Sequence, residues 1–132
     1  MKGEIEFVSH PANLCLVRNF VREFLSRIEI SEKDKDLMIL GLDEACTNVI
    51  RYAYEHCTNK LMVLSCECDG YIVTFRLRDF GAKCSQEKLK GRDLEAIAPG
   101  GLGIHLIRTA FTTVDYIHCE EGTELVLGRA IA

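Results

Sequence analysis

The sequence predicts an α+β fold, namely a two-layer sandwich in which helices cover one face of a mostly antiparallel sheet. Three observations lead to this fold. Segments with a two-residue apolar period and segments with a three- to four-residue period both occur, and they do not alternate strictly along the chain. Residues 71–79 carry one apolar and one mostly polar face, as in an antiparallel sheet that is covered on one side. The 132 residues suit a single domain, which we assign to residues 1–132.

The N-terminal part of the chain reads as a strand followed by two amphipathic helices. The strand is expected at residues 4–8, and Ser9, two residues before Pro11, marks a helix start. Ser31 precedes several acidic residues and predicts the N-cap of a second helix that runs to about Tyr54. In the first helix, apolar residues recur at three- and four-residue steps, at Leu14, Val17, Val21, Phe24 and Ile28.

The C-terminal part combines strands with one long polar segment. A two-residue period on both sides of Asp69-Gly70 predicts a tight hairpin, and a second turn is expected at Glu121-Gly122. Residues 82–99 are polar and aperiodic, and a loop this long in a compact domain is usually functional or mobile. We therefore expect strands at residues 61–68, 71–79, 114–119 and 123–131, and a third helix at residues 102–111.

Composition and charge argue against several classes of protein. The net charge of −4 argues against general nucleic-acid binding, which requires a basic face. No apolar run approaches the roughly 18 residues that cross a bilayer, and the N-terminus lacks the apolar core of a signal peptide. We therefore expect a cytoplasmic protein without membrane contact. The seven cysteines include no Cys-x-x-Cys pair, so reduced thiols acting as small apolar residues are favoured over a metal site.

The second expected helix carries a polar stripe beside its apolar one. Glu44 and Asn48 are four residues apart and therefore project from one helix face, in a stripe with Gly41, Arg51 and Glu55. A carboxylate beside a carboxamide could hold a divalent metal together with a nucleotide phosphate, or the carboxylate could take a proton from an attacking hydroxyl. Spacing alone favours a third interpretation, in which both side chains are simply solvated.

Asp79 breaks the polarity pattern of the strand at residues 71–79. It keeps phase with the apolar positions and therefore points to the buried side where the strand ends. A buried carboxylate requires a donor, which could be the exocyclic amine of adenine or a partner within the fold. Gly81 allows backbone or ligand to come close. Thr123 shares the phase of the apolar positions in the last strand, so its hydroxyl could face the same interior, although a plain strand threonine is the default.

A glycine-rich segment, residues 99–103, leads from the polar loop into the third helix. Free backbone amides and the helix dipole attract phosphates there, and Gly100, Gly101 and Gly103 would let the chain bend towards them. The segment is not a P-loop, since no Gly-Lys-Ser/Thr follows. A flexible helix entry is the plain alternative. A polar loop that ends in glycines also reads as a hinged lid, over about residues 82–101.

In chain order, these segments resemble the nucleotide-binding boxes of the GHKL, or Bergerat-fold, ATPases, and most closely the serine/threonine kinases of the anti-sigma-factor type. LDEACTNVIRYAY (42–54) resembles the Glu-x-x-x-Asn box, and LRDFGAKC (77–84) resembles the Asp-x-Gly adenine box. PGGLGIHLIRTAFTTVDYI (99–117) resembles the Gly-Gly-Leu-Gly box and its helix, and EGTELVL (121–127) resembles the closing strand. Four boxes in order span nearly the whole chain and imply a sandwich of the Bergerat (GHKL) type.

The resemblance also implies roles for individual residues. Asn48 would hold the Mg²⁺ ion bound to the phosphates of ATP, and Glu44 would be the general base that activates a serine or threonine hydroxyl on a protein substrate. Asp79 would bind the adenine amine, with Gly81 and Thr123 beside the base. Further nucleotide contacts are implied for Arg51, Gly100, Gly101, Leu102 and Gly103.

A kinase of this type would act in a bacterial partner-switching system. It would phosphorylate an anti-sigma factor antagonist, which is a small STAS-type domain, and it would sequester a sigma factor or another regulator. The family suggests a homodimer. The alternative is an ATP-binding partner-switch module that sequesters a regulator without phosphotransfer. The chain departs from the family at four positions, which bear more on partner contacts than on ATP binding: Val49, Tyr52, Lys83 and Thr112.

Overall fold

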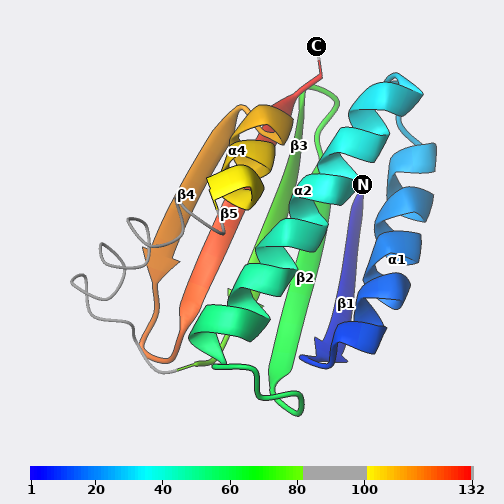
Figure 1. Ribbon diagram of the computed structural model, residues 1–132. Helices are drawn as coiled ribbons and strands as arrows, with labels where there is room; N and C mark the ends of the chain where they lie inside the picture. Colours follow the sequence, from blue (N-terminus) through cyan, green and yellow to red (C-terminus); the bar gives the residue numbers. More distant parts are fainter. Residues whose placement is uncertain (82–100, 132) are drawn as a thin grey trace.

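Helices and sheet form two layers in the computed structural model of this chain, which describes residues 1–81 and 101–131 (Figure 1). The strands pair antiparallel in the order β1-β2-β3-β5-β4, and the helices lie on one face of this sheet. The predicted α+β sandwich is therefore confirmed. The strands are β1 (Lys2–Val8), β2 (Leu61–Cys68), β3 (Ile72–Asp79), β4 (Thr113–His118) and β5 (Thr123–Ala130). The helical segments are η1 (Pro11–Asn13), α1 (Leu14–Ser26), α2 (Glu32–Asn48), η2 (Val49–Ala53) and α4 (Gly101–Ala110).

The sheet register places the apolar set of each strand on the helix-covered face. Leu77 of β3 lies opposite Leu64 of β2 on one side and Leu125 of β5 on the other. A one-residue slip would turn this whole set towards solvent, so the burial of apolar surface fixes the register. The largest fully buried side chains come from both layers: Val21, Leu25, Met38, Leu42, Met62, Leu64, Val73, Phe75, Leu77 and Leu127.

The first helical segment begins at Pro11, close to the predicted start. It is the short 3-10 turn η1, whose N-cap is His10 rather than Ser9, and α1 follows it. Ser9 is instead fully buried; its hydroxyl donates to the Cys57 carbonyl at 2.6 Å and accepts from the Lys60 amide at 3.1 Å. Ser9 thus bonds to residues distant in the sequence instead of capping a helix. These bonds join the N-terminal segment to the residues just before β2.

The second helix extends about as far as predicted but changes pitch on the way. The Ser31 hydroxyl accepts from the Asp34 amide, which confirms the expected N-cap. After Asn48 the helix continues as the π-helical segment η2 and ends at Ala53. Short π segments are rare and often occur at functional sites. The change of pitch lies directly after the predicted Glu44 and Asn48 pair.

Two of the cysteines lie in the core between sheet and helices. Burial raises the pKa of Cys46 and of Cys66 to about 12 each, so both remain neutral thiols packed among apolar side chains. Cys15 and Cys57 are exposed. Within residues 1–81 and 101–131, no helix combines the length and apolar character that crossing a membrane requires.

Candidate functional site

The predicted site residues come from elements that meet at one end of the sandwich. In Figure 1, α2 descends to the same end at which β3 finishes and β5 begins, and α4 runs antiparallel beside α2. Side-chain contacts join these elements directly: the Phe80 amide, just after β3, donates to the Tyr54 hydroxyl, just after η2, at 2.7 Å. Residues more than twenty positions apart in the sequence are therefore in direct contact at this end.

Asp79 lies where its phase predicted, at the end of β3 on the helix-covered face, and is only 5% exposed. Its Oδ1 accepts a hydrogen bond from the Gly81 amide at 3.1 Å, and the Thr123 amide also lowers its pKa. Burial outweighs both amides, so the pKa of Asp79 is raised above its ordinary value. The carboxylate is thus incompletely compensated in its charged form, and a further donor placed here would be favoured.

Two glycines allow the chain to close tightly around Asp79. A Cβ atom at Gly81 would lie 2.9 Å from the Ala53 carbonyl oxygen, which confirms the expected close approach of backbone at this position. Gly122 has a φ of +79°, and a Cβ atom there would overlap the Asp79 carbonyl and lie 2.7 Å from the Phe80 Cα. The sequence indicated Gly122 only as a turn residue; its contact with the strand end depends on the pairing of β3 with β5.

Thr123 begins β5 at intermediate exposure and shares the phase of Leu125 and Leu127, both of which are buried. Its side chain therefore belongs to the helix-covered side of the sheet, as its phase predicted. Within Thr123, the backbone amide rather than the hydroxyl lowers the pKa of the Asp79 carboxylate, and the phase of the strand did not predict this contact.

Glu44 and Asn48 lie on the side of α2 that faces α4. Gly41, three residues before Glu44, is buried there, because a Cβ atom would lie 3.0 Å from both the Ala110 Cβ and the Phe111 ring. Glu44 and Asn48 are half-buried, and within the described residues neither side chain has a hydrogen bond or ion pair. The neighbouring Asp43, in contrast, is held by Arg18 at 2.6 Å. Among residues 1–81 and 101–131, a half-buried carboxylate and carboxamide thus lie without a partner beside α4.

Arg51 lies in η2 and is exposed, with its guanidinium 5.9 Å from the centroid of the Tyr52 ring. It continues the stripe of Glu44 and Asn48 by one helical turn, onto the π-helical segment. Its long, exposed side chain thus places a positive charge at this end of the second helix.

The glycine-rich segment opens α4. Gly101, Leu102 and Gly103 form the first turn of this helix, so the predicted helix begins one residue earlier than expected. Gly100 and the predicted lid up to residue 100 lie outside the described residues. Because α4 runs antiparallel to α2, its N-terminal turn lies beside the C-terminal half of α2, where Glu44 and Asn48 project (Figure 1). Backbone amides at a helix N-terminus favour bound anions.

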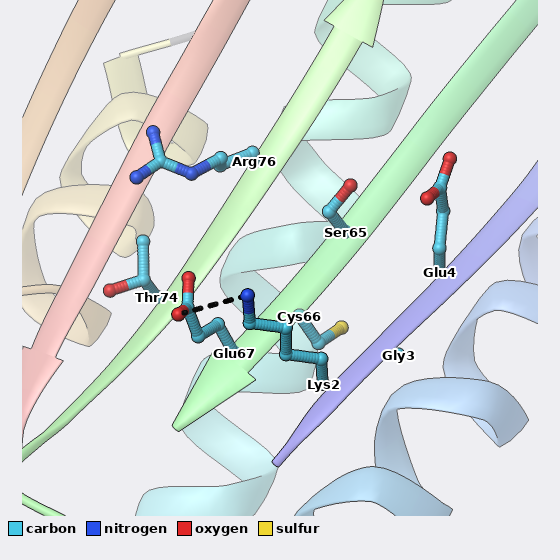
Figure 2. Close-up of a pocket in the computed structure, with 8 residues that line it drawn as sticks. All are labelled: Lys2, Gly3, Glu4, Ser65, Cys66, Glu67, Thr74 and Arg76. Atoms are coloured by element: carbon cyan, nitrogen blue, oxygen red, sulfur yellow. Dashed lines mark ion pairs between the residues drawn. The ribbon is translucent and has the colours of Figure 1, made fainter. Parts of the chain in front are cut away.

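A separate shallow hollow of about 380 Å³ lies on the opposite face of the sheet. Figure 2 shows side chains of β1, β2 and β3 around it, with Arg76 and Ser65 projecting away from the helices and an ion pair of 3.9 Å between Lys2 and Glu67. It contains none of the predicted site residues. Within the described residues, no group of three or more His, Cys, Asp or Glu side chains is arranged to hold a metal ion.

Comparison with known proteins agrees with this fold. The histidine kinase-like ATPase domain family matches residues 7–129, which contain every element from α1 to β4 and nearly all of β5. Curated relatives named serine-protein kinase RsbW, from Bacillus mycoides (strain KBAB4) and Bacillus thuringiensis (strain Al Hakam), are 20% identical over 98% of this chain and 85% of their own length. A protein of the same name from Bacillus anthracis gives the same identity and coverage.

Proposed function

We propose a function that follows from the family of this chain, which belongs to the histidine kinase-like ATPase domains. The protein binds ATP and transfers its γ-phosphoryl group to a serine or threonine of a protein substrate. The observation that carries this proposal is the buried Asp79 carboxylate, at the end of the sandwich to which α2 also brings Glu44 and Asn48. The relatives named serine-protein kinase support the choice of substrate class.

The base and the phosphates of ATP each have matching groups at this end of the sandwich. Asp79 is buried at the strand end, which raises its pKa, and the exocyclic amine of adenine would donate to its charged form. Gly81 and Thr123 lie beside that carboxylate. We assign the phosphates to the N-terminal turn of α4, namely Gly101, Leu102 and Gly103, preceded by Gly100 and the lid, with Arg51 as a further cation.

Phosphoryl transfer requires positioning and charge stabilisation more than covalent chemistry from the protein. Mg²⁺ would be held by the Asn48 carboxamide together with phosphate oxygens, and when bound it neutralises charge on the phosphates. Glu44 accepts the proton of the attacking hydroxyl. The hydroxyl oxygen then bonds to the γ-phosphorus as the bond to the bridging oxygen breaks, which leaves ADP and a phosphorylated substrate. Glu44 is half-buried and has no partner among the residues that the structure describes, which suits a general base.

The partners follow from the same proposal. A cytoplasmic kinase of this type phosphorylates an anti-sigma factor antagonist with a STAS-type domain and sequesters a sigma factor or another regulator. A homodimer would present two such surfaces. We make these proposals from the named relatives and from the resemblance of the four boxes.

Glu44→Gln tests the proposed base. It keeps the shape of the side chain and removes the proton acceptor, so transfer from labelled ATP to a cognate antagonist should fall by about 10²- to 10⁴-fold with ATP affinity nearly unchanged. Glu23→Gln on the exposed side of α1 is the matched control and should transfer normally. Transfer by Glu44→Gln at the wild-type rate would exclude this base. ATP binding by the wild type without any transfer would instead support a partner-switch module, and absence of ATP binding would exclude both functions.

A further inference from the structure

One buried hydroxyl joins three backbone segments next to Asp79. Tyr54, the residue after η2, is 5% exposed, and its hydroxyl donates to the Leu61 carbonyl at the start of β2. The same oxygen accepts the Phe80 amide at 2.7 Å. Burial raises the pKa of Tyr54, so the phenol remains protonated and can both donate and accept. The end of the second helix is thus fixed to the beginning of one strand and the end of the next.

The Tyr54 contact acts on the turn that orients Asp79. Phe80 is flanked by Asp79 and by Gly81, whose amide donates to the Asp79 carboxylate at 3.1 Å. Fixing the Phe80 amide therefore fixes the peptide groups on which the direction of that carboxylate depends. The Tyr54 ring adds to this restraint, because its Cε1 atom lies 3.3 Å from the position of a Cβ atom at Gly81.

The backbone on both sides of Tyr54 is irregular, and this conformation places the Tyr54 side chain at the end of β3. The helix widens into the π-helical η2 just before it, and Glu55 and His56 follow with φ of 48° and 67°. Left-handed backbone at two successive residues other than glycine is unfavourable and persists where surrounding contacts impose it. Here the His56 amide donates to the Ile50 carbonyl at 2.8 Å, and buried Ser9 holds the Cys57 carbonyl.

We propose that Tyr54 is a positioning residue for nucleobase recognition, which acts by holding the turn after β3 so that the Asp79 carboxylate meets the exocyclic amine of a purine. This inference rests on the proposed function. The contact joins the helical segment that follows Asn48 to the strand that ends in Asp79, so Tyr54 links the phosphate side of the site to the base side. Its effect is confined to ligands whose base carries that amine.

Tyr54→Phe tests the inference, since it retains the buried ring and removes only the hydroxyl. The test compares the affinities for ATP and for purine riboside triphosphate, which lacks the exocyclic amine, by calorimetry with magnesium present. The variant should bind ATP about 5- to 10-fold more weakly, the loss of roughly one hydrogen bond, and should bind the amine-free analogue within about 2-fold of wild type. Tyr71→Phe, at the exposed hairpin between β2 and β3, is the control and should change neither affinity.

A double-mutant cycle shows whether the effect passes through the carboxylate. In an Asp79→Asn background, Tyr54→Phe should no longer change the affinity for ATP, because residues that act through one another are not additive. Equal weakening of both nucleotides by Tyr54→Phe would overturn the inference and assign Tyr54 a purely structural role. Unchanged ATP affinity would overturn it as well.

Three measurements keep these outcomes separate from failures of folding or of the proposed function. Amide hydrogen exchange on the wild type should show slow exchange at Phe80 before nucleotide is added, and rapid exchange there would overturn the inference without any variant. Weakened ATP binding by Asp79→Asn with unchanged binding by Tyr54→Phe would leave the proposed function standing and remove only the role of Tyr54. Failure of the wild type to bind ATP would refute the proposed function itself.

Discussion

Replacing Asp79 by asparagine separates the function of this residue from its effect on the fold. The substitution keeps the side-chain shape, and its amide oxygen can still accept the Gly81 amide that now lies 3.1 Å from Oδ1. It removes the buried negative charge, whose desolvation raises the pKa of Asp79. Nucleotide affinity should therefore fall, whereas the stability of the nucleotide-free protein should not.

The expected loss of affinity follows from the kind of hydrogen bond removed. A hydrogen bond to a charged group contributes about 1.5–3 kcal/mol, and each 1.4 kcal/mol is roughly a factor of ten in the dissociation constant. Asp79→Asn should therefore weaken ATP binding about 10- to 150-fold. Without nucleotide, the free energy of unfolding at neutral pH should be unchanged or higher than that of wild type, because an uncharged amide is less costly to bury than a carboxylate.

Stability and ATP affinity should depend on pH with opposite signs. A carboxyl group with a raised pKa in the folded state stabilises the fold at low pH, and that contribution is lost as pH rises from 3.8 through the folded-state value. Asp79→Asn should flatten this fall in the free energy of unfolding. ATP affinity should move the other way, increasing as pH rises through the same range, since the amine requires the charged carboxylate.

Isothermal calorimetry and denaturant unfolding measure these two quantities. Asp115→Asn is the matched control, because Asp115 is an exposed carboxylate on β4, the strand beside β5. It should change ATP affinity by less than about 2-fold. The reasoning is refuted if Asp79→Asn binds ATP as tightly as wild type, or if both substitutions weaken binding equally, since the second result would indicate a general effect of charge.

Two further predictions concern the fold. Gly122→Ala should lower the free energy of unfolding by about 2–4 kcal/mol in denaturant titrations, because alanine is strained at φ +79° and its Cβ atom would overlap the Asp79 carbonyl; a loss below about 0.5 kcal/mol would contradict the closeness of this contact. The exposed Cys57 thiol should react with a thiol reagent in the native protein, whereas Cys46, buried with a pKa of about 12, should react only after unfolding. Mass spectrometry of the labelled protein distinguishes the two sites, and equal labelling rates would show that the core is open.

Local patterns were sufficient for much of the fold. The two-residue period in residues 71–79 correctly placed Asp79 on the covered face, because alternation in a strand leaves only two possible directions. The Ser31 cap was predictable for a similar reason, since its hydroxyl needs only the amide three residues on. The helix start near Ser9 was predictable as well, but the partners of its hydroxyl, the Cys57 carbonyl and the Lys60 amide, were not, because they are distant in the sequence.

The sequence by itself determined the two layers, the candidate residues on each element and the resemblance of four boxes, since these depend on period and spacing. The tertiary structure decided what surrounds those residues. It gave Gly122 a contact with the strand end that its turn did not indicate, and it made Tyr54 the partner of Phe80. It also left Glu44 unpaired within the described residues while Asp43 found Arg18. Such differences arise from contacts between segments far apart in the chain. No local pattern encodes them, because burial and pairing depend on how the helices pack against the sheet.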